Sequence, residues 1–198
     1  MNSTSSLEKN SGLRRHKRQS PTHLSKHDRL STMRTALCRI GSGLGFRTWI
    51  PENNLEQTAC NDWIDATINL QNEPLLNDCI DAQRAILELD CVWFSGNRHL
   101  PAAMIVETGE GIGDGLIRLL TLYEYIKPFQ TRWVIVAPDD DRNLVFTHCQ
   151  KPQFRKMKPR FFPYSAVEEL NSLCSNRKIR GITEDFLDCF MEQTVPEN

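Results

Sequence analysis

The chain has 198 residues, of which 39% are hydrophobic and 25% charged, and its formal net charge is −1. A chain of this length and composition is expected to form one domain around one core. It has no run of about eighteen apolar residues, so we expect no membrane span. No apolar segment follows the charged N-terminus, so we expect no secretory signal. Seven dispersed cysteines without a CxxC pair favour reduced thiols and a cytoplasmic location.

Residues 1–28 are expected to form a disordered basic tail, followed by a single α/β domain over residues 29–198. The tail holds six lysines and arginines against two acids, a net charge of +4, and no aromatic residue. Such a segment buries too little apolar surface to offset the entropy of ordering it. Two interpretations stay open: an arm that touches nucleic-acid phosphates, and a solubilising tail.

In chain order, the first half of the domain is expected to contain a helix, a strand, a polar irregular insertion, a second helix and two strands. They are expected over residues 30–44, 46–50, 51–78, 78–88, 89–94 and 102–107. Apolar residues recur at steps of three and four in the first helix. A turn at 95–97 allows the last two strands to pair as an antiparallel hairpin.

The second half is expected to contain a helix, a strand, a helix, a strand and two further helices. They are expected over residues 112–126, 133–137, 139–150, 160–163, 165–176 and 184–192. The unbroken run Trp-Val-Ile-Val-Ala at 133–137 is typical of a strand covered on both faces. Three acids at 139–141 open the second helix of this half, where the helix dipole favours negative charge; we prefer this interpretation to a metal site. A helix between two apolar strands favours a sheet with helices on its faces.

A second basic segment lies within residues 142–167, which contain no acid. Its candidate nucleic-acid-binding residues are Lys151, Arg155, Lys156, Lys158 and Arg160. Three phenylalanines accompany them, so phosphate contact combined with base stacking is one interpretation. The other is a solvated surface above core aromatic residues.

Two acids, Asp90 and Glu107, lie on the two strands of the expected hairpin, which can bring them side by side. Neighbouring carboxylates repel, so one is protonated or a cation lies between them. Mg²⁺ binds one or two protein carboxylates and completes its shell with water and phosphate oxygens, and a metal-bound water can attack a phosphodiester. The alternative is a pair of partly exposed edge carboxylates that form ion pairs with Arg118 or Arg98.

Several of these segments together resemble the PD-(D/E)XK, or restriction-endonuclease-like, superfamily. They are Leu-Asp-Cys-Val-Trp at 89–93, Ala-Met-Ile-Val-Glu at 103–107, Gly-Leu-Ile-Arg-Leu at 115–119, Ile-Val-Ala-Pro-Asp at 135–139 and Pro-Tyr-Ser-Ala at 163–166. The resemblance covers residues 30–169. It implies an α/β fold with an αβββαβ core, in which helices flank a mixed central sheet, and this chain adds C-terminal helices.

The resemblance implies a Mg²⁺-dependent DNA endonuclease, a hydrolase of phosphodiesters. Asp90 and Glu107 are the implied catalytic metal ligands, the Val106 carbonyl assists them, and Arg118 acts at the phosphate. Ile105 stands where the superfamily has its second acid, so this position is degenerate. The alternative is a nuclease fold with a decayed site that binds nucleic acid or a protein partner. DNA is the implied partner, and a homodimer is expected because enzymes of this kind that cut both strands are commonly dimers.

Overall fold

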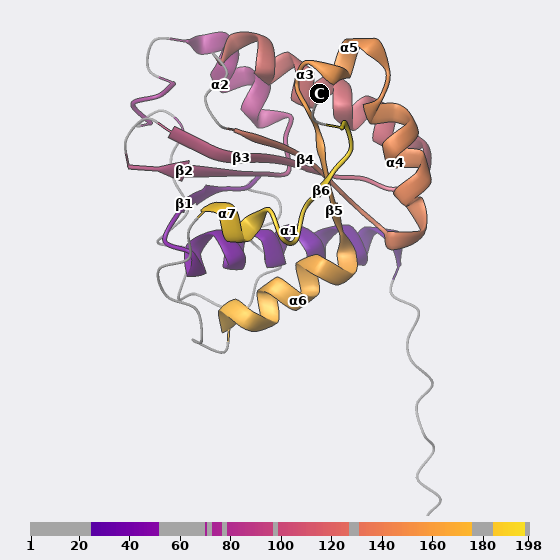
Figure 1. Ribbon diagram of the computed structural model, residues 1–198. Coiled ribbons are helices and arrows are strands. Elements are labelled where there is room, and N and C mark those ends of the chain that lie inside the picture. The colour runs from indigo at the N-terminus through magenta and orange to yellow at the C-terminus, as the bar shows by residue number, and fades with distance from the viewer. Residues whose placement is uncertain are drawn as a thin grey trace, which may run out of the picture.

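The computed structural model describes residues 25–51, 70, 73–76, 79–96, 99–126, 131–175 and 184–196. In this part of the chain, a six-stranded sheet in the order β1-β2-β3-β4-β5-β6 lies between two layers of helices (Figure 1). The sheet is mixed, and the architecture is the α/β class that the sequence predicts. It is consistent with a restriction-endonuclease-like fold.

The sheet combines an antiparallel half and a parallel half. The strands are β1 (Arg47–Trp49), β2 (Cys91–Ser95), β3 (His99–Val106), β4 (Arg132–Ala137), β5 (Arg160–Pro163) and β6 (Glu192–Gln193). β1, β2 and β3 pair antiparallel, β3, β4 and β5 pair parallel, and β6 pairs antiparallel with β5. The predicted hairpin of β2 and β3 is therefore confirmed.

Helices cover both faces of the sheet. They are α1 (Lys26–Gly43), α2 (Ile80–Leu87), α3 (Ile112–Tyr125), α4 (Arg142–Cys149), α5 (Pro152–Arg155), α6 (Tyr164–Ser175) and α7 (Glu184–Leu187), with 3₁₀ turns η4 (Gly109–Gly111) and η5 (Asp139–Asp141). The predicted helix over 139–150 is thus η5 followed by α4. No helix in the part of the chain that the structure describes is long and apolar enough to cross a membrane.

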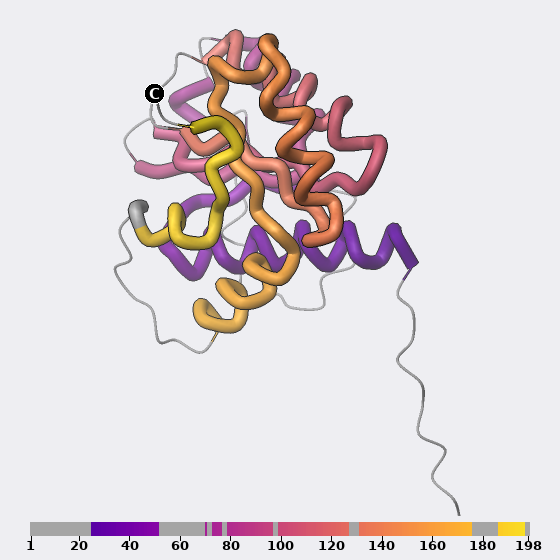
Figure 2. The backbone as a smooth tube through the Cα atoms, turned by 45° about the vertical axis from the view of Figure 1, so that its right-hand side comes forward, coloured from indigo at the N-terminus to yellow at the C-terminus, as the bar shows by residue number. Residues whose placement is uncertain are grey.

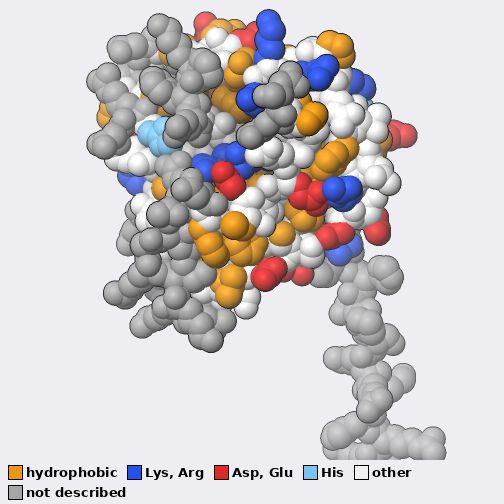
Figure 3. Space-filling view, in the orientation of Figure 1, with side chains coloured by type: hydrophobic (Ala, Val, Ile, Leu, Met, Phe, Trp, Pro, Cys, Tyr) orange, Lys and Arg blue, Asp and Glu red, His pale blue; other side chains and the backbone are white. Residues whose placement is uncertain are grey.

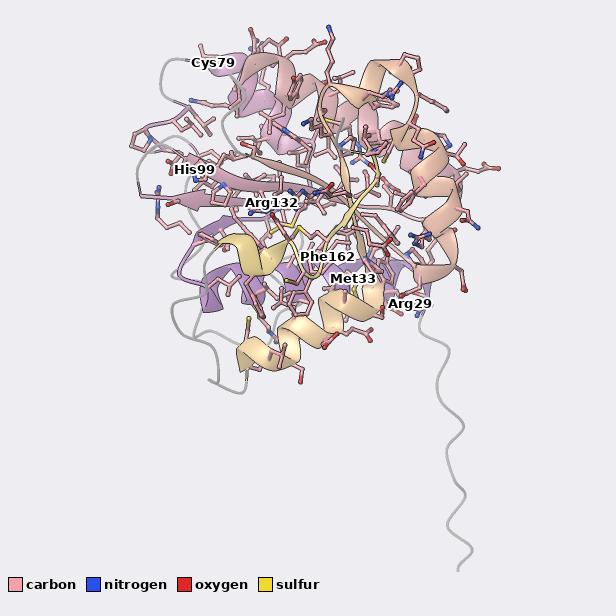
Figure 4. All side chains as sticks on the ribbon, viewed as in Figure 1. Arg29, Met33, Cys79, His99, Arg132 and Phe162 are labelled. Atoms are coloured by element: carbon pink, nitrogen blue, oxygen red, sulfur yellow. The ribbon has the colours of Figure 1, made fainter. Side chains whose placement is uncertain are left out.

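Two hydrophobic clusters form the core, one on each face. α2, α3, α4 and α5 pack around Ile105 on one face, and α1, α6 and α7 pack around Val106 on the other. Successive strand residues point to opposite faces, which separates these two neighbours. Figure 4 labels Met33 of α1 and Phe162 of β5, which both belong to the cluster around Val106. None of the six cysteines that the structure describes is joined in a disulfide.

Helix α1 begins before the position that periodicity predicts. The Ser25 hydroxyl accepts the N–H of Asp28, and the Asp28 carboxylate accepts the N–H of Ser25, both at 3.2 Å. This capping box satisfies two amide groups that a helix start otherwise leaves without acceptors. Residues 26–28, assigned to the tail, belong to this helix. Residues 1–24 of the tail and most of the 51–78 insertion lie outside the described residues.

The C-terminal segment corrects a prediction. A helix was expected over 184–192, but α7 ends at Leu187 and the chain continues into strand β6. Asp188 follows α7, and its carboxylate lies 2.6 Å from Arg132 Nε and 2.5 Å from Arg160 Nη1. Figure 2 shows this segment, in yellow, running beside β5. Tertiary ion pairs and strand pairing therefore outweigh the local helix preference.

Candidate active site at the carboxyl end of the parallel strands

The candidate residues gather where the parallel strands end. Val106 ends β3 opposite Val136 of β4, and the chain continues into Glu107. Tyr164 directly follows β5 in the same direction. β2 runs antiparallel to β3, so Asp90, which precedes β2, lies at the same edge. Crevices outside the carboxyl ends of parallel strands are the usual ligand sites of open α/β sheets.

Asp90 is buried, with 4% of its surface exposed. Its Oδ2 accepts the N–H of Val106 at 2.8 Å. The carboxylate thus supplies the acceptor that a neighbouring strand would otherwise provide at the end of β3. Its Oδ1 lies 2.7 Å from Nε of Arg34 on α1. Arg34 therefore neutralises the buried carboxylate by its charge.

Glu107 extends the parallel ladder by one residue, since its N–H donates to the Val136 carbonyl at 3.0 Å. Its side chain is 22% exposed and forms an ion pair with Arg118 of α3. Nη1 of Arg118 also donates to the Glu88 carbonyl at 3.1 Å. The second arginine therefore links α3 to the residue that follows β3 and to the end of α2.

The glycine-rich bend makes room for the Glu107 side chain. A Cβ on Gly111 would collide with the Glu107 carboxylate, and one on Gly115 would lie 2.7 Å from Cγ2 of Ile105. The start of α3 can approach β3 this closely because these positions lack side chains. The bend is therefore a packing feature of the site.

The two acids form ion pairs with helices on opposite faces of the sheet. Arg34 belongs to α1, which packs on the Val106 face, and Arg118 belongs to α3, which packs on the Ile105 face. The pairing of Glu107 with Arg118 was one of the sequence alternatives. The partner of Asp90 was missed; the available signal was a basic residue beside the apolar stripe of α1.

Tyr164 is a further residue of this edge that the sequence analysis gave no role. It is 4% exposed, and its hydroxyl has no hydrogen-bond partner among the described residues. Burial raises the pKa of Tyr164 to about 12; Arg29 and Arg34 lower it, and Asp141 and Glu107 raise it further. Charged groups from α1, from η5 and from the residue after β3 therefore lie around a buried, neutral hydroxyl.

The acids of η5 hold neighbouring elements together. Asp141 Oδ2 accepts the N–H of Gly109 at 2.9 Å. Asp139 accepts the N–H of Ser165 at 3.2 Å and also the Ser165 hydroxyl. These contacts attach η5 to the glycine bend and to the start of α6. They give the acids a structural role beyond the helix dipole.

Asp90 and Glu107 match Mg²⁺ in donor type, because one or two protein carboxylates suffice when water and phosphate oxygens complete the shell. Within the described residues, no group of three or more His, Cys, Asp or Glu side chains is arranged to hold a metal ion. Each of the two carboxylates instead faces an arginine. The two carboxylates are therefore the right type of ligand for Mg²⁺, and binding the ion requires Arg34 or Arg118 to move away.

The predicted nucleic-acid-binding residues lie at the other end of the parallel strands. They are Lys151, Arg155, Lys156, Lys158 and Arg160. All but Arg160 are exposed, and Arg160, which begins β5, forms an ion pair with Asp188. Figure 3 shows several lysine and arginine side chains at the top of the view, around α5. The structure thus separates this basic segment from the carboxyl-end site.

The sequence is similar to one family of known proteins. Residues 13–194 match the family model described as the type II restriction enzyme NmeDI C-terminal domain. The chain is 42% identical over 168 residues to the type II restriction enzyme NmeDI of Neisseria meningitidis serogroup C. The match covers 81% of this chain and 48% of that protein, so the chain spans about half the length of this curated relative. No solved structure matches the chain.

Proposed function

Since the chain belongs to the family of the type II restriction enzyme NmeDI C-terminal domain, we propose that it cleaves DNA as the nuclease part of a restriction-type endonuclease. The supporting observation is that Asp90 and Glu107, the two proposed metal ligands, both lie at the carboxyl end of the parallel strands, against Val106 and Val136. We further propose that the domain is of PD-(D/E)XK type, with Ile105 in place of the second acid.

Asp90 and Glu107 would hold Mg²⁺, together with the Val106 carbonyl. The ion would supply an activated water and offset the charge that develops on the phosphate. Arg34 and Arg118 already lie against these carboxylates. Guanidinium groups bind phosphate oxygens as well as they bind carboxylates. We therefore expect both arginines to exchange a carboxylate for a DNA phosphate when substrate enters.

A second candidate function is a nuclease fold that has lost its chemistry and binds nucleic acid or a protein partner. Two observations favour it. Each carboxylate is neutralised by an arginine, as in a structural ion pair. Ile105 is fully buried in the α3-side cluster and brings no ligand to the site.

A plasmid-nicking assay with Mg²⁺ or Mn²⁺ separates the two candidates. The wild type should nick DNA, and Asp90→Asn should lower the rate by about 10²-fold, because a lost metal ligand raises the barrier by about 3 kcal/mol. Asp81→Asn, at an exposed position on α2, is the matched control and should cleave like the wild type.

Three other outcomes would redirect the proposal. Equal cleavage by wild type and Asp90→Asn means that the site is elsewhere. DNA binding without cleavage supports the second candidate. Failure to bind nucleic acid at any salt concentration points to a protein partner, because nucleic-acid binding strengthens as salt is lowered. Sedimentation of the DNA complex tests the homodimer that cleavage of both strands implies.

A further inference from the structure

One buried hydrogen-bond donor at the candidate site, the hydroxyl of Tyr164, lacks an acceptor among the described residues. The Nε of Arg34 lies in an ion pair, 2.7 Å from the Asp90 carboxylate. Tyr164 is 4% exposed, and the Arg34 side chain is 20% exposed. Buried donors are nearly always satisfied in native proteins, so unsatisfied ones at a candidate site indicate a missing ligand.

The surroundings of the Tyr164 hydroxyl favour an anion. Arg29 is exposed on the first turns of α1, and Figure 4 shows it at the end of α1 where the helix begins. Arg29 and Arg34 both lie within electrostatic reach of the Tyr164 hydroxyl. The N-terminus of an α-helix adds a partial positive charge and favours anionic groups.

The acids that face this position already have partners. Asp90 is paired with Arg34 and bound by the Val106 N–H. Glu107 is paired with Arg118, and Asp141 accepts the N–H of Gly109. Arg34 and Arg118 thus offset the charges of Asp90 and Glu107, and the exposed Arg29 can attract a ligand from solvent.

We propose that Tyr164, Arg29 and Arg34 form a subsite that binds a backbone phosphate of the DNA. The groups are all donors, and phosphate oxygens are acceptors that take several such bonds at once. The Tyr164 hydroxyl is protonated at neutral pH, as tyrosine ordinarily is, and can therefore donate. The subsite shares the sheet edge with Glu107, so it holds the DNA strand beside the candidate active site. This inference rests on the proposed action on DNA.

The test is the affinity for a short fluorescent duplex, measured by anisotropy over a series of salt concentrations with Ca²⁺ in place of Mg²⁺. Arg29→Gln should weaken binding about tenfold and reduce the salt slope by about one, as expected for one lost phosphate contact. Tyr164→Phe should weaken binding about fivefold and leave the slope unchanged, since it removes a neutral donor. Thermal unfolding confirms that each variant is folded.

Matched controls are Arg84→Gln, which replaces an exposed arginine on α2, and Tyr125→Phe, which replaces an exposed tyrosine on α3. Both should bind like the wild type. Arg155→Gln tests the competing surface around α5, where we expect a smaller loss than in Arg29→Gln.

The proposal is overturned if Arg29→Gln and Tyr164→Phe bind like the wild type, or if Arg155→Gln weakens binding more than Arg29→Gln does. These outcomes leave the proposed cleavage intact when the wild type still nicks plasmid with Mg²⁺. The converse result, weakened binding in both variants of a chain that never cleaves, supports the subsite and rejects the nuclease. A wild type that binds no DNA rejects both.

Discussion

Asp90 and Arg34 form an ion pair that joins the start of β2 to helix α1, with 2.7 Å between Oδ1 and Nε. The second oxygen of Asp90 accepts the Val106 N–H, so one buried carboxylate joins a helix and two strands. Removing one partner of a buried ion pair leaves an uncompensated charge, which is strongly destabilising. Asp90 therefore has a structural role whatever its part in catalysis.

The first prediction concerns this pair. Asp90→Ala should lower the free energy of unfolding by about 3 kcal/mol, because Arg34 and the Val106 N–H lose their partner. The measurement is urea unfolding. Asp81→Ala removes an exposed carboxylate that lies 3.7 Å from Arg84, and we expect a loss of about 0.5 kcal/mol or less. Equal losses in the two variants would show that Asp90 is not a buried ion-pair partner.

The second prediction concerns the close approach of α3 to β3. Gly115→Ala should destabilise the protein by about 1–3 kcal/mol, because the added methyl group overlaps Ile105 and crowds Glu107. Gly96 is the control, since a Cβ there meets nothing within 4 Å, and Gly96→Ala should be neutral or slightly stabilising. Thermal unfolding of both variants is the measurement. A fully stable Gly115→Ala variant would contradict the packing of the bend.

The third prediction concerns the C-terminal segment. Asp188→Ala should lower the free energy of unfolding by about 2 kcal/mol, because it removes the shared partner of Arg132, which is buried, and of Arg160. Glu192→Ala breaks only the exposed pair with Arg142 and should cost less than about 1 kcal/mol. Amide hydrogen exchange should show faster exchange in β6 and β5 of Asp188→Ala. Unchanged protection there would contradict the anchoring role.

The fourth prediction concerns stability at alkaline pH. The pKa of Tyr164 is about 12 in the folded chain, and the ordinary value in an unfolded chain is about 10. Between these values the unfolded chain releases the proton and the folded chain keeps it, so the free energy of unfolding falls as the pH rises.

Tyr164→Phe removes this dependence. The stability difference between wild type and Tyr164→Phe should shift by about 1 kcal/mol, against the wild type, between about pH 9 and about pH 11. The buried thiols Cys91 and Cys149, whose pKa values burial also raises, occur in both proteins and cancel. A difference that does not change with pH would show that the Tyr164 hydroxyl is accessible to water.

Local patterns were sufficient for most of the fold. The apolar runs of β3 and β4 and the periodicity of α3 depend on neighbouring residues only. β4 and α3 form within one residue of the predicted bounds, and β3 begins three residues earlier than predicted, at His99. β6 was missed because it spans Glu192–Gln193 alone and exists through pairing with β5. A strand that short leaves no period to detect.

The site was predictable where its contacts are local. Glu107 and Arg118 belong to one strand–bend–helix unit, and their pairing was among the alternatives. Arg34 was missed because periodicity shows which face of α1 is buried but not which carboxylate lies opposite. The basic segment lies far from the site because β4 and β5 run parallel. The composition of the segment does not indicate the direction of these strands.

The central claim is that the carboxyl-end edge of the sheet acts on DNA, and a crystal structure of the chain with an uncleaved duplex and Ca²⁺ tests it most directly. We predict an ion coordinated by Asp90 and Glu107, with Arg34 turned toward a backbone phosphate. Duplex bound along the basic segment around α5, with the Asp90–Arg34 and Glu107–Arg118 pairs intact and no ion between the carboxylates, would contradict the claim.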